Sequence, residues 1–352
     1  MKIWRIFNPE HDMALAAGTR GFTPPAAGRD MRYWLGFLPS FWADDGDVVV
    51  VDDVEVAQTC AAPFKRWLPN VTYVTLNTSL CFAKDIPPLT IDVWGWDAAV
   101  RWQLIKAGVM KDNDLPDDAM VSDIRRLSHR EASIPILKAL VEANDFTIGE
   151  RLCLRSIDAV RSYIERNHRI VVKAPWSCSG RGIYYLQDHL NDKETGLVGN
   201  IIRQQGAIVV EPWYDKALDL AFEFTSDGQG GIMYEGLSLF DTLNGAYTGN
   251  LLVPEKQKLH LLESYINPDK IFVVREQLLS ILAGEIAHDY IGPLGVDMMI
   301  IRTDMGFFLN PCVEINLRRT MGHVALSVAR RTNYQFRTMR IVPGRQYYLH
   351  LD

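Results

Sequence analysis

Several features that would mark particular classes of protein are missing from this 352-residue sequence. Its five cysteines are an odd number and none forms a CxxC pair, so a structural zinc site is not indicated and reduced thiols are the simplest interpretation. No stretch reaches the length of a membrane-spanning helix. The apolar run at the start is too short for a secretion signal and leads directly into polar residues 10–12. We therefore expect a cytoplasmic protein without membrane contact.

Concentrated positive charge is also missing. The net charge is −6, and basic residues form only short clusters. Because a nucleic-acid surface needs a strong basic stripe, we do not expect nucleic acid as a partner. The P-loop pattern G-x-x-x-x-G-K-[ST] is absent, and neither an internal repeat nor a low-complexity segment is present. With 48% hydrophobic and 23% charged residues, the chain has the composition of a globular protein of two or three domains.

The N-terminal third alternates between strand and helix patterns. Buried strands are predicted at 2–8, 47–53, 71–76 and 91–96. Helices are predicted between and after them at 54–66 and 97–108. This alternation predicts a small parallel α/β domain that is closed by an acidic, proline-containing linker at 111–120.

The remaining chain mixes helices with strands in longer blocks. Helices are predicted at 130–144, 156–167, 188–205 and 271–291, and a last long helix begins at Thr320. Residues 169–186 predict a strand, a small polar loop and a second strand. Three strands are predicted within 294–319, the first hairpin turning near 304–306.

Polar residues interrupt two of these C-terminal strands. Alternation in the segment CVEINLR places Glu314, Asn316 and Arg318 on one face and apolar residues on the other. Asp297 interrupts GVDMMII in the same way. If the strands are neighbours, the oxygens of Asp297, Glu314 and Asn316 converge into a set that suits Mg²⁺, which would offset the cost of burying the carboxylates. The simpler alternative is an edge strand with a solvated face.

Lys173 ends an apolar strand and precedes a loop rich in serine and glycine. Gly180 and Gly182 permit close backbone approach, so the loop's N–H groups could face an anion. An ordinary hairpin turn explains the loop equally well. A later apolar strand ends in Glu211, a proline and Trp213, which indicates a hinge between two halves of a fold.

The order of these elements resembles the ATP-grasp superfamily over roughly residues 125–335. The resemblance implies an α/β fold class, α+β in the C-terminal half. An N-terminal domain (1–120) would precede an ATP-grasp fold of two subdomains, 121–210 and 211–352, the last holding the metal. ATP and Mg²⁺, or Mn²⁺, are the implied cofactors.

Roles for individual residues follow from the same resemblance. Asp297, Glu314 and Asn316 would hold the metal on the nucleotide phosphates, while Arg318 would stabilise the charge of the transferred group. The positions implied around the nucleotide are Lys173 at the α- and β-phosphates, Ser177, Ser179, Gly180 and Gly182 in a loop closing over the phosphates, Glu211 and Trp213 at the adenine, and Asp219 at the ribose.

The sequence lacks one basic residue that is usual in the family. A second nucleotide-contacting lysine is usual before the first strand of the ATP-grasp domain, and none lies between Lys111 and Lys138. Arg130 is the replacement that the resemblance suggests, with a helix-surface arginine as the alternative. The additional Arg319 and His323 could bind a substrate carboxylate or phosphate, although His323 is equally explained as a satisfied buried histidine.

A polar group follows the first predicted strand and is our hypothesis for part of the substrate site. Its members are Asn8, Glu10, His11 and Asp12, with Asp97 after a neighbouring strand. Helix capping by Asn8 or Asp12 is the alternative, and a metal site at His11 is a weaker one. Asn244, Tyr247 and Asn250 could line an acceptor site, or simply belong to two strands and a turn.

These features together predict an ATP- and Mg²⁺-dependent ligase that joins a small-molecule carboxylate to an amine, or to a thiol, through an acyl phosphate. A small-molecule kinase with the same fold and a non-catalytic ATP-binding regulatory protein are the alternatives. We expect a monomer or a homodimer.

Overall fold

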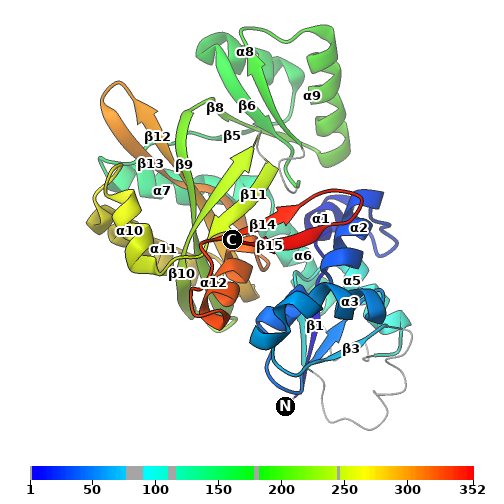
Figure 1. The fold of residues 1–352 in the computed structure, drawn as a ribbon. Coiled ribbons are helices and arrows are strands. Elements are labelled where there is room, and N and C mark those ends of the chain that lie inside the picture. Colours follow the sequence, from blue (N-terminus) through cyan, green and yellow to red (C-terminus); the bar gives the residue numbers. More distant parts are fainter. Residues whose placement is uncertain (1, 77–89, 110–115, 178–181, 244–245) are drawn as a thin grey trace.

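The computed structural model describes residues 2–76, 90–109, 116–177, 182–243 and 246–352. Within these ranges the strands form three sheets, of four, seven and four strands. Figure 1 shows the N-terminal sheet at the bottom, the seven-stranded sheet through the middle, and the remaining sheet at the top. No described helix combines the length and the apolar character needed to cross a membrane.

The N-terminal sheet is parallel, with strand order β3-β2-β1-β4. Its strands are β1 (Ile3–Ile6), β2 (Val48–Val50), β3 (Thr72–Val74) and β4 (Thr90–Val93). Around them lie α1 (His11–Ala17), α2 (Ala26–Leu35), α3 (Val54–Ala61), α5 (Ala98–Lys106), η1 (Leu38–Phe41) and η2 (Ala62–Trp67). Trp4 and Ile6 enter one core and Phe7 the opposite one, so both faces are covered, as the apolar strands predict.

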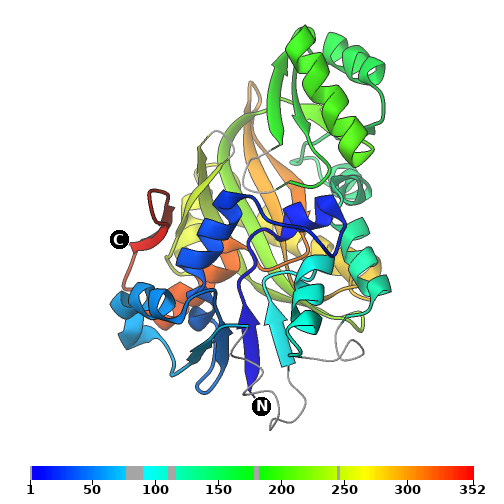
Figure 2. The ribbon, with the colours of Figure 1, turned by 90° about the vertical axis from the view of Figure 1, so that its right-hand side faces the viewer.

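The central sheet is antiparallel, with strand order β5-β8-β6-β7, and follows α6 (Asp118–Leu127), η4 (Arg130–Ser133) and α7 (Ile134–Ala143). Its strands are β5 (Leu152–Leu154), β6 (Arg169–Lys173), β7 (Ile183–Gln187) and β8 (Ile208–Pro212). Two helices, α8 (Ile157–Asn167) and α9 (Asp192–Gln205), share its apolar core, which includes Val160, Ile164 and Val198. They are the green helices at the top of Figure 2.

The seven-stranded sheet has the order β13-β12-β9-β10-β11-β14-β15. Its strands are β9 (Asp215–Asp227), β10 (Ile232–Leu243), β11 (Ala246–Leu251), β12 (Ile291–Thr303), β13 (Gly306–Asn316), β14 (Thr338–Val342) and β15 (Tyr348–Leu351). The apolar residues of β9 and β12 pack in one core with α11 (Pro268–Glu285), next to α10 (Glu255–Leu262). In another core α12 (Met321–Arg331) packs with N-terminal residues such as Phe7 and Leu35. The N-terminal sheet is thereby joined to the large sheet.

The predicted fold class, α/β with α+β in the C-terminal half, is confirmed. The prediction of three strands within 294–319 is wrong, because β13 runs unbroken through Pro311. Pairing between β12 and β13 shifts register after Asp297, and such an irregularity accommodates a residue without an N–H group. Helix α9 begins at Asp192 rather than 188, where Asn191 and Glu194 form a capping box. Strands β14 and β15 were not predicted.

The predicted boundary between residues 210 and 211 divides a strand. All of β8 pairs inside the central sheet, and the chain joins the large sheet only at Asp215. The change of sheet therefore falls between Pro212 and Asp215.

Candidate active site

The three predicted metal-binding residues lie together on adjacent strands of the large sheet. Asp297 on β12 is paired in register with Glu314 on β13. The amide of Asn316 donates to Asp297 Oδ2 at 3.2 Å. Val296 and Ile315 point the other way, into the apolar core, as the alternation predicts. We call Asp297, Glu314, Asn316 and Arg318 the catalytic wall, after the roles that the family resemblance predicts for them.

Asp297 is the member of the catalytic wall whose negative charge has no ion-pair partner in the described part of the chain. Burial, reinforced by the nearby charges of Glu314 and Glu223, raises the pKa of Asp297 well above its usual range. In the described part of the chain, no ion pair joins Asp297 to an arginine, lysine or histidine. A carboxylate in such surroundings is stabilised in its charged form by a cation.

Glu314, by contrast, already has a cationic partner. Arg130 Nη2 lies 2.8 Å from Glu314 Oε1, and the arginine is only 4% exposed. Its other terminal nitrogen donates to the carbonyl of Ala174 and to Ser177 Oγ. Arg130 is therefore not a helix-surface arginine, because it links η4 and the start of the 177–182 loop to the catalytic wall.

Arg318 connects the catalytic wall to the N-terminal segment. Its guanidinium donates to both oxygens of Asp12 at 2.9–3.0 Å, a bidentate pair. Burial opposes both charges, but the pairing is stronger: it raises the pKa of Arg318 and lowers that of Asp12. The segment after β1 is thus fixed against the end of β13.

Lys173 and Glu211 form a buried ion pair on neighbouring strands of the central sheet. Lys173 Nζ lies 2.5 Å from Glu211 Oε1, and both side chains are buried. Arg151, which the sequence analysis did not single out, reaches Glu211 Oε2 at 3.1 Å and the carbonyl of Val313 at 2.6 Å. Burial disfavours the charged form of both side chains. At Lys173 burial prevails and lowers the pKa. At Glu211 the attraction of Lys173 and Arg151 outweighs burial, so the pKa of this carboxyl is lowered as well.

The predicted phosphate loop is partly described. Ser179 and Gly180 lie outside the described residues. Gly182 has φ of +77°, and an added Cβ would lie 3.1 Å from side-chain carbons of Ala174 and Ser177, so glycine suits this position. The N–H of Ala174 donates to the carbonyl of Gly182 at 2.8 Å, which closes the ends of a hairpin between β6 and β7. Contact with phosphates stays a prediction.

The remaining predicted nucleotide contacts already have protein partners. The N–H of Trp213 donates to the carbonyl of Arg169 at 3.0 Å, and its ring lies 4.2 Å from the Arg169 guanidinium. An adenine contact by the Trp213 backbone would therefore have to use its carbonyl. Asp219 accepts from Lys216 at 2.5 Å and from Thr242 at 2.7 Å.

The polar segment after β1 does not act as a helix cap. The cap position of α1 is Glu10, whose side chain makes no capping bond. Asn8 donates to the carbonyl of Gly95 at 2.8 Å, and His11 Nδ1 lies 3.2 Å from Asp97 Oδ2. Arg32 donates to Glu10, although burial still raises the pKa of this carboxyl.

A metal site at His11 is not supported. Glu10, His11 and Asp12 turn to three different partners, namely Arg32, Asp97 and Arg318. In the described ranges no three His, Cys, Asp or Glu side chains gather as metal ligands would.

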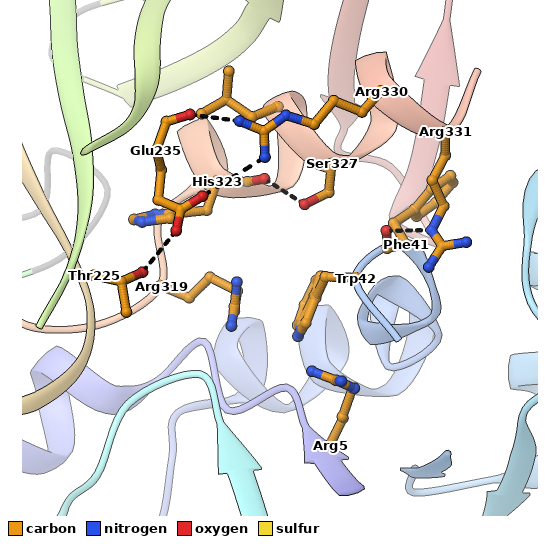
Figure 3. A pocket seen from close by; sticks show the side chains of 11 residues that line it. Arg5, Phe41, Trp42, Thr225, Glu235, Arg319, His323, Ser327, Arg330 and Arg331 are labelled. Atoms are coloured by element: carbon orange, nitrogen blue, oxygen red, sulfur yellow. Dashed lines mark hydrogen bonds and ion pairs between the residues drawn. The ribbon is translucent and has the colours of Figure 1, made fainter. Parts of the chain in front are cut away.

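Arg319 and His323 lie apart from the catalytic wall, on a cavity shown in Figure 3. Arg319 reaches Asp92 at 3.3 Å and lies 4.6 Å from the ring of Trp42. His323 is buried, with Nε2 donating to the carbonyl of Phe224 at 3.1 Å and Nδ1 3.0 Å from Glu223 Oε2. These contacts fit the alternative of a satisfied buried histidine, and a substrate role for either residue stays a prediction.

Among the possible acceptor-site residues, Asn244 lies outside the described residues. Asn250 donates to Ser238 Oγ at 2.7 Å and accepts from Tyr247. The bond to Ser238 joins β11 to β10, and the contact with Tyr247 lies within β11, which matches the simpler interpretation of two paired strands.

Comparison with solved structures identifies the fold of the chain. No protein-family model and no curated protein matches the chain. The N5-carboxyaminoimidazole synthetase of Staphylococcus aureus, solved with ADP, gives a TM-score of 0.51 at 13% identity, over 97% of this chain and 83% of that one. A biotin carboxylase–β,γ-ATP complex from Campylobacter jejuni gives 0.50 at 11% identity, over 98% and 73%. At these identities the likeness shows the fold alone, and it confirms the ATP-grasp fold that the resemblance implies.

Proposed function

We propose that the protein is an ATP- and Mg²⁺-dependent ligase that joins a small-molecule carboxylate to an amine or a thiol. Asp297 carries the proposal, because its pKa is raised by burial and it has no cationic partner among the described residues. Carboxylate and amide oxygens of Glu314 and Asn316 complete a set of hard ligands that suits Mg²⁺. The adenine nucleotides named with the two similar structures support ATP as the nucleotide.

The reaction would proceed in two transfers. A substrate carboxylate oxygen attacks the γ-phosphorus of ATP, the bond to ADP breaks, and an acyl phosphate forms. The amine or thiol then attacks the acyl carbon, phosphate leaves with the electrons of the C–O bond, and the nucleophile loses its proton to solvent. When bound, Mg²⁺ supplies charge neutralisation at the phosphates.

The protein's own part would be positioning and charge stabilisation. Lys173, held by Glu211 at 2.5 Å, points a fixed ammonium toward the phosphates in this proposal. Arg318 would stabilise the acyl phosphate, and its bidentate pair with Asp12 orients it. The substrate carboxylate would lie near the segment that contains Asn8, Glu10, His11 and Asp12.

Thermal unfolding with nucleotides tests the proposal first. A ligand that binds only the folded state raises the melting temperature. We expect ATP to raise it in a Mg²⁺-dependent manner and GTP to raise it less. Absence of any nucleotide effect would contradict the proposal. If ATP binds, ADP release is screened against amino acids and small acids; a stable phosphorylated product formed without an amine would instead identify the kinase.

The variant Glu314→Gln sharpens this test. It removes a proposed metal ligand while keeping the side-chain shape, so we expect turnover to be abolished with the fold intact. Asp304→Asn, in the exposed turn between β12 and β13, is the matched control. Near-wild-type turnover in Glu314→Gln would exclude the metal role.

A further inference from the structure

A cavity of about 410 Å³ lies between the N-terminal sheet and α12. Its size falls in the range of small-molecule sites, roughly 300–1,000 Å³. Arg5 of β1 and Trp42 line it from the N-terminal side, and Arg319, Arg330 and Arg331 line it from the C-terminal side (Figure 3). A molecule bound here would contact both parts of the protein.

The side chains that line this cavity are rich in positive charge. Four guanidinium groups line it, against one carboxylate, Glu235. Arg330 is paired with Glu235 at 3.6 Å. Arg5 forms ion pairs with Asp47 at 2.8 Å and Asp92 at 2.7 Å, two carboxylates that do not line the cavity. Four arginines against Glu235, Asp47 and Asp92 leave one net positive charge around the cavity.

Arg331 has no carboxylate partner among the described residues, and Arg319 shares Asp92 with Arg5. The hydrogen bonds that Arg331 makes within the described ranges go to the backbone carbonyls of Phe41 and Ala43. Arg319 reaches only Asp92, which Arg5 already holds more closely, and its Nε is buried without a hydrogen-bond partner in the described structure. A guanidinium whose carboxylate is shared or missing can donate charge-assisted hydrogen bonds to an anionic ligand.

We propose that this cavity binds a small acidic molecule, one that carries a phosphate ester or a pair of carboxylates, at a site separate from the ATP site. Planar guanidinium groups from different elements match the paired oxygens of these groups. Arg318 and Arg319 turn to opposite sides, toward Asp12 and Asp92 respectively. The ligand would thus bind behind the catalytic wall while contacting the segment that carries Arg318.

The test is calorimetric titration of the full chain with inorganic phosphate, glycerol 3-phosphate and malonate. Each titration is run with and without a non-hydrolysable ATP analogue, so that anion binding at the ATP site is recognised by its competition. We expect at least one probe to bind in both conditions. Stronger binding of the phosphates or of malonate identifies which acid the site prefers.

Four variants locate the binding. Arg319→Gln and Arg331→Gln should each weaken the probe by about tenfold or more, the scale of one charge-assisted contact. Arg318→Gln on the catalytic wall and Arg161→Gln, a surface arginine of α8 paired with Asp158, should leave it unchanged. Melting temperatures without ligand show which variants remain folded; if Arg331→Gln unfolds through loss of its carbonyl contacts, Arg319→Gln decides.

Three results would overturn the proposal. These are no binding of any probe, equal weakening in the surface control, and displacement of every probe by the ATP analogue. The last would place the anion at the nucleotide phosphates. Because the titration without nucleotide needs no ATP binding, its outcome is independent of the proposed ligase function.

Discussion

Two carboxylates in the ATP-grasp half of the protein have opposite surroundings. Glu211 in the central sheet is held by Lys173 at 2.5 Å and Arg151 at 3.1 Å, and these cations lower its pKa against the effect of burial. Asp297 in the large sheet has neighbouring acids and no paired cation among the described residues, and its pKa is raised by burial and by those acids.

The difference separates a carboxylate that is paired with cations inside the protein from one that is not. The charge of Glu211 is balanced within the protein, since both of its carboxylate oxygens have cationic donors. Asp297 has only the amide of Asn316 as a hydrogen-bond donor in the described structure and forms no ion pair there, so its charged form is less stabilised than that of Glu211. The catalytic wall and the central ion network can therefore be distinguished by mutation.

Replacing Asp297 should have the largest effect on function. We expect Asp297→Asn to lower turnover by about a thousandfold, or about 4 kcal/mol in the barrier, because a proposed ligand of the metal is lost. The free energy of unfolding without metal should not fall, because burial disfavours a charged carboxylate at this position and asparagine carries no charge. ADP release measures the turnover, Mg²⁺-dependent stabilisation by ATP measures the metal role, and urea unfolding measures the stability. A variant that keeps the full Mg²⁺ effect would contradict the role.

Replacing Glu211 should have the largest effect on stability. Glu211→Gln leaves Lys173 and Arg151 as two buried cations without a counter-charge, and breaking such a network costs about 3 kcal/mol. We expect the free energy of unfolding in urea to fall by this amount. Unchanged stability would show that the ion network is not what holds the central sheet to β13.

The two carboxylates should give pH dependences of opposite sign. The pKa of Glu211 is lowered on folding, so its stabilisation is present above its ordinary value of 4.5 and is lost as the pH falls through the folded value. The pKa of Asp297 is raised, so the folded state retains a proton and stability declines as the pH rises above 3.8 toward the folded value. Asp297→Asn should remove the second slope and Glu211→Gln the first, in urea titrations across pH. Unchanged slopes in both variants would refute this assignment.

Breaking an exposed ion pair should have the smallest effect on stability. Arg155 and Glu131 lie 2.8 Å apart but are largely exposed, at 61% and 42%. Because solvent screens such pairs, Glu131→Gln should leave the melting temperature without a measurable change. A loss comparable to that of Glu211→Gln would show that burial is not what distinguishes the two pairs.

The catalytic wall was predictable because its signal is local. Glu314 and Asn316 interrupt an apolar strand at a period of two, and Asp297 interrupts another strand in the same way. Arg130 was suggested only by the family resemblance, and its pairing with Glu314 joins residues 184 positions apart. Arg151 carries no periodic signal, so its place between Glu211 and Val313 was not expected.

The sequence by itself determined the alternation of strands and helices, the ATP-grasp order of elements and the polar face of β13. These follow from backbone geometry, which sets the direction of each side chain over a few residues. The tertiary structure alone decided which charge meets which: Arg318 with Asp12, Lys173 with Glu211, and Arg319 on a cavity between two sheets. Such pairings depend on how distant segments pack, and the free energy of a buried charge depends on those neighbours rather than on the residue itself.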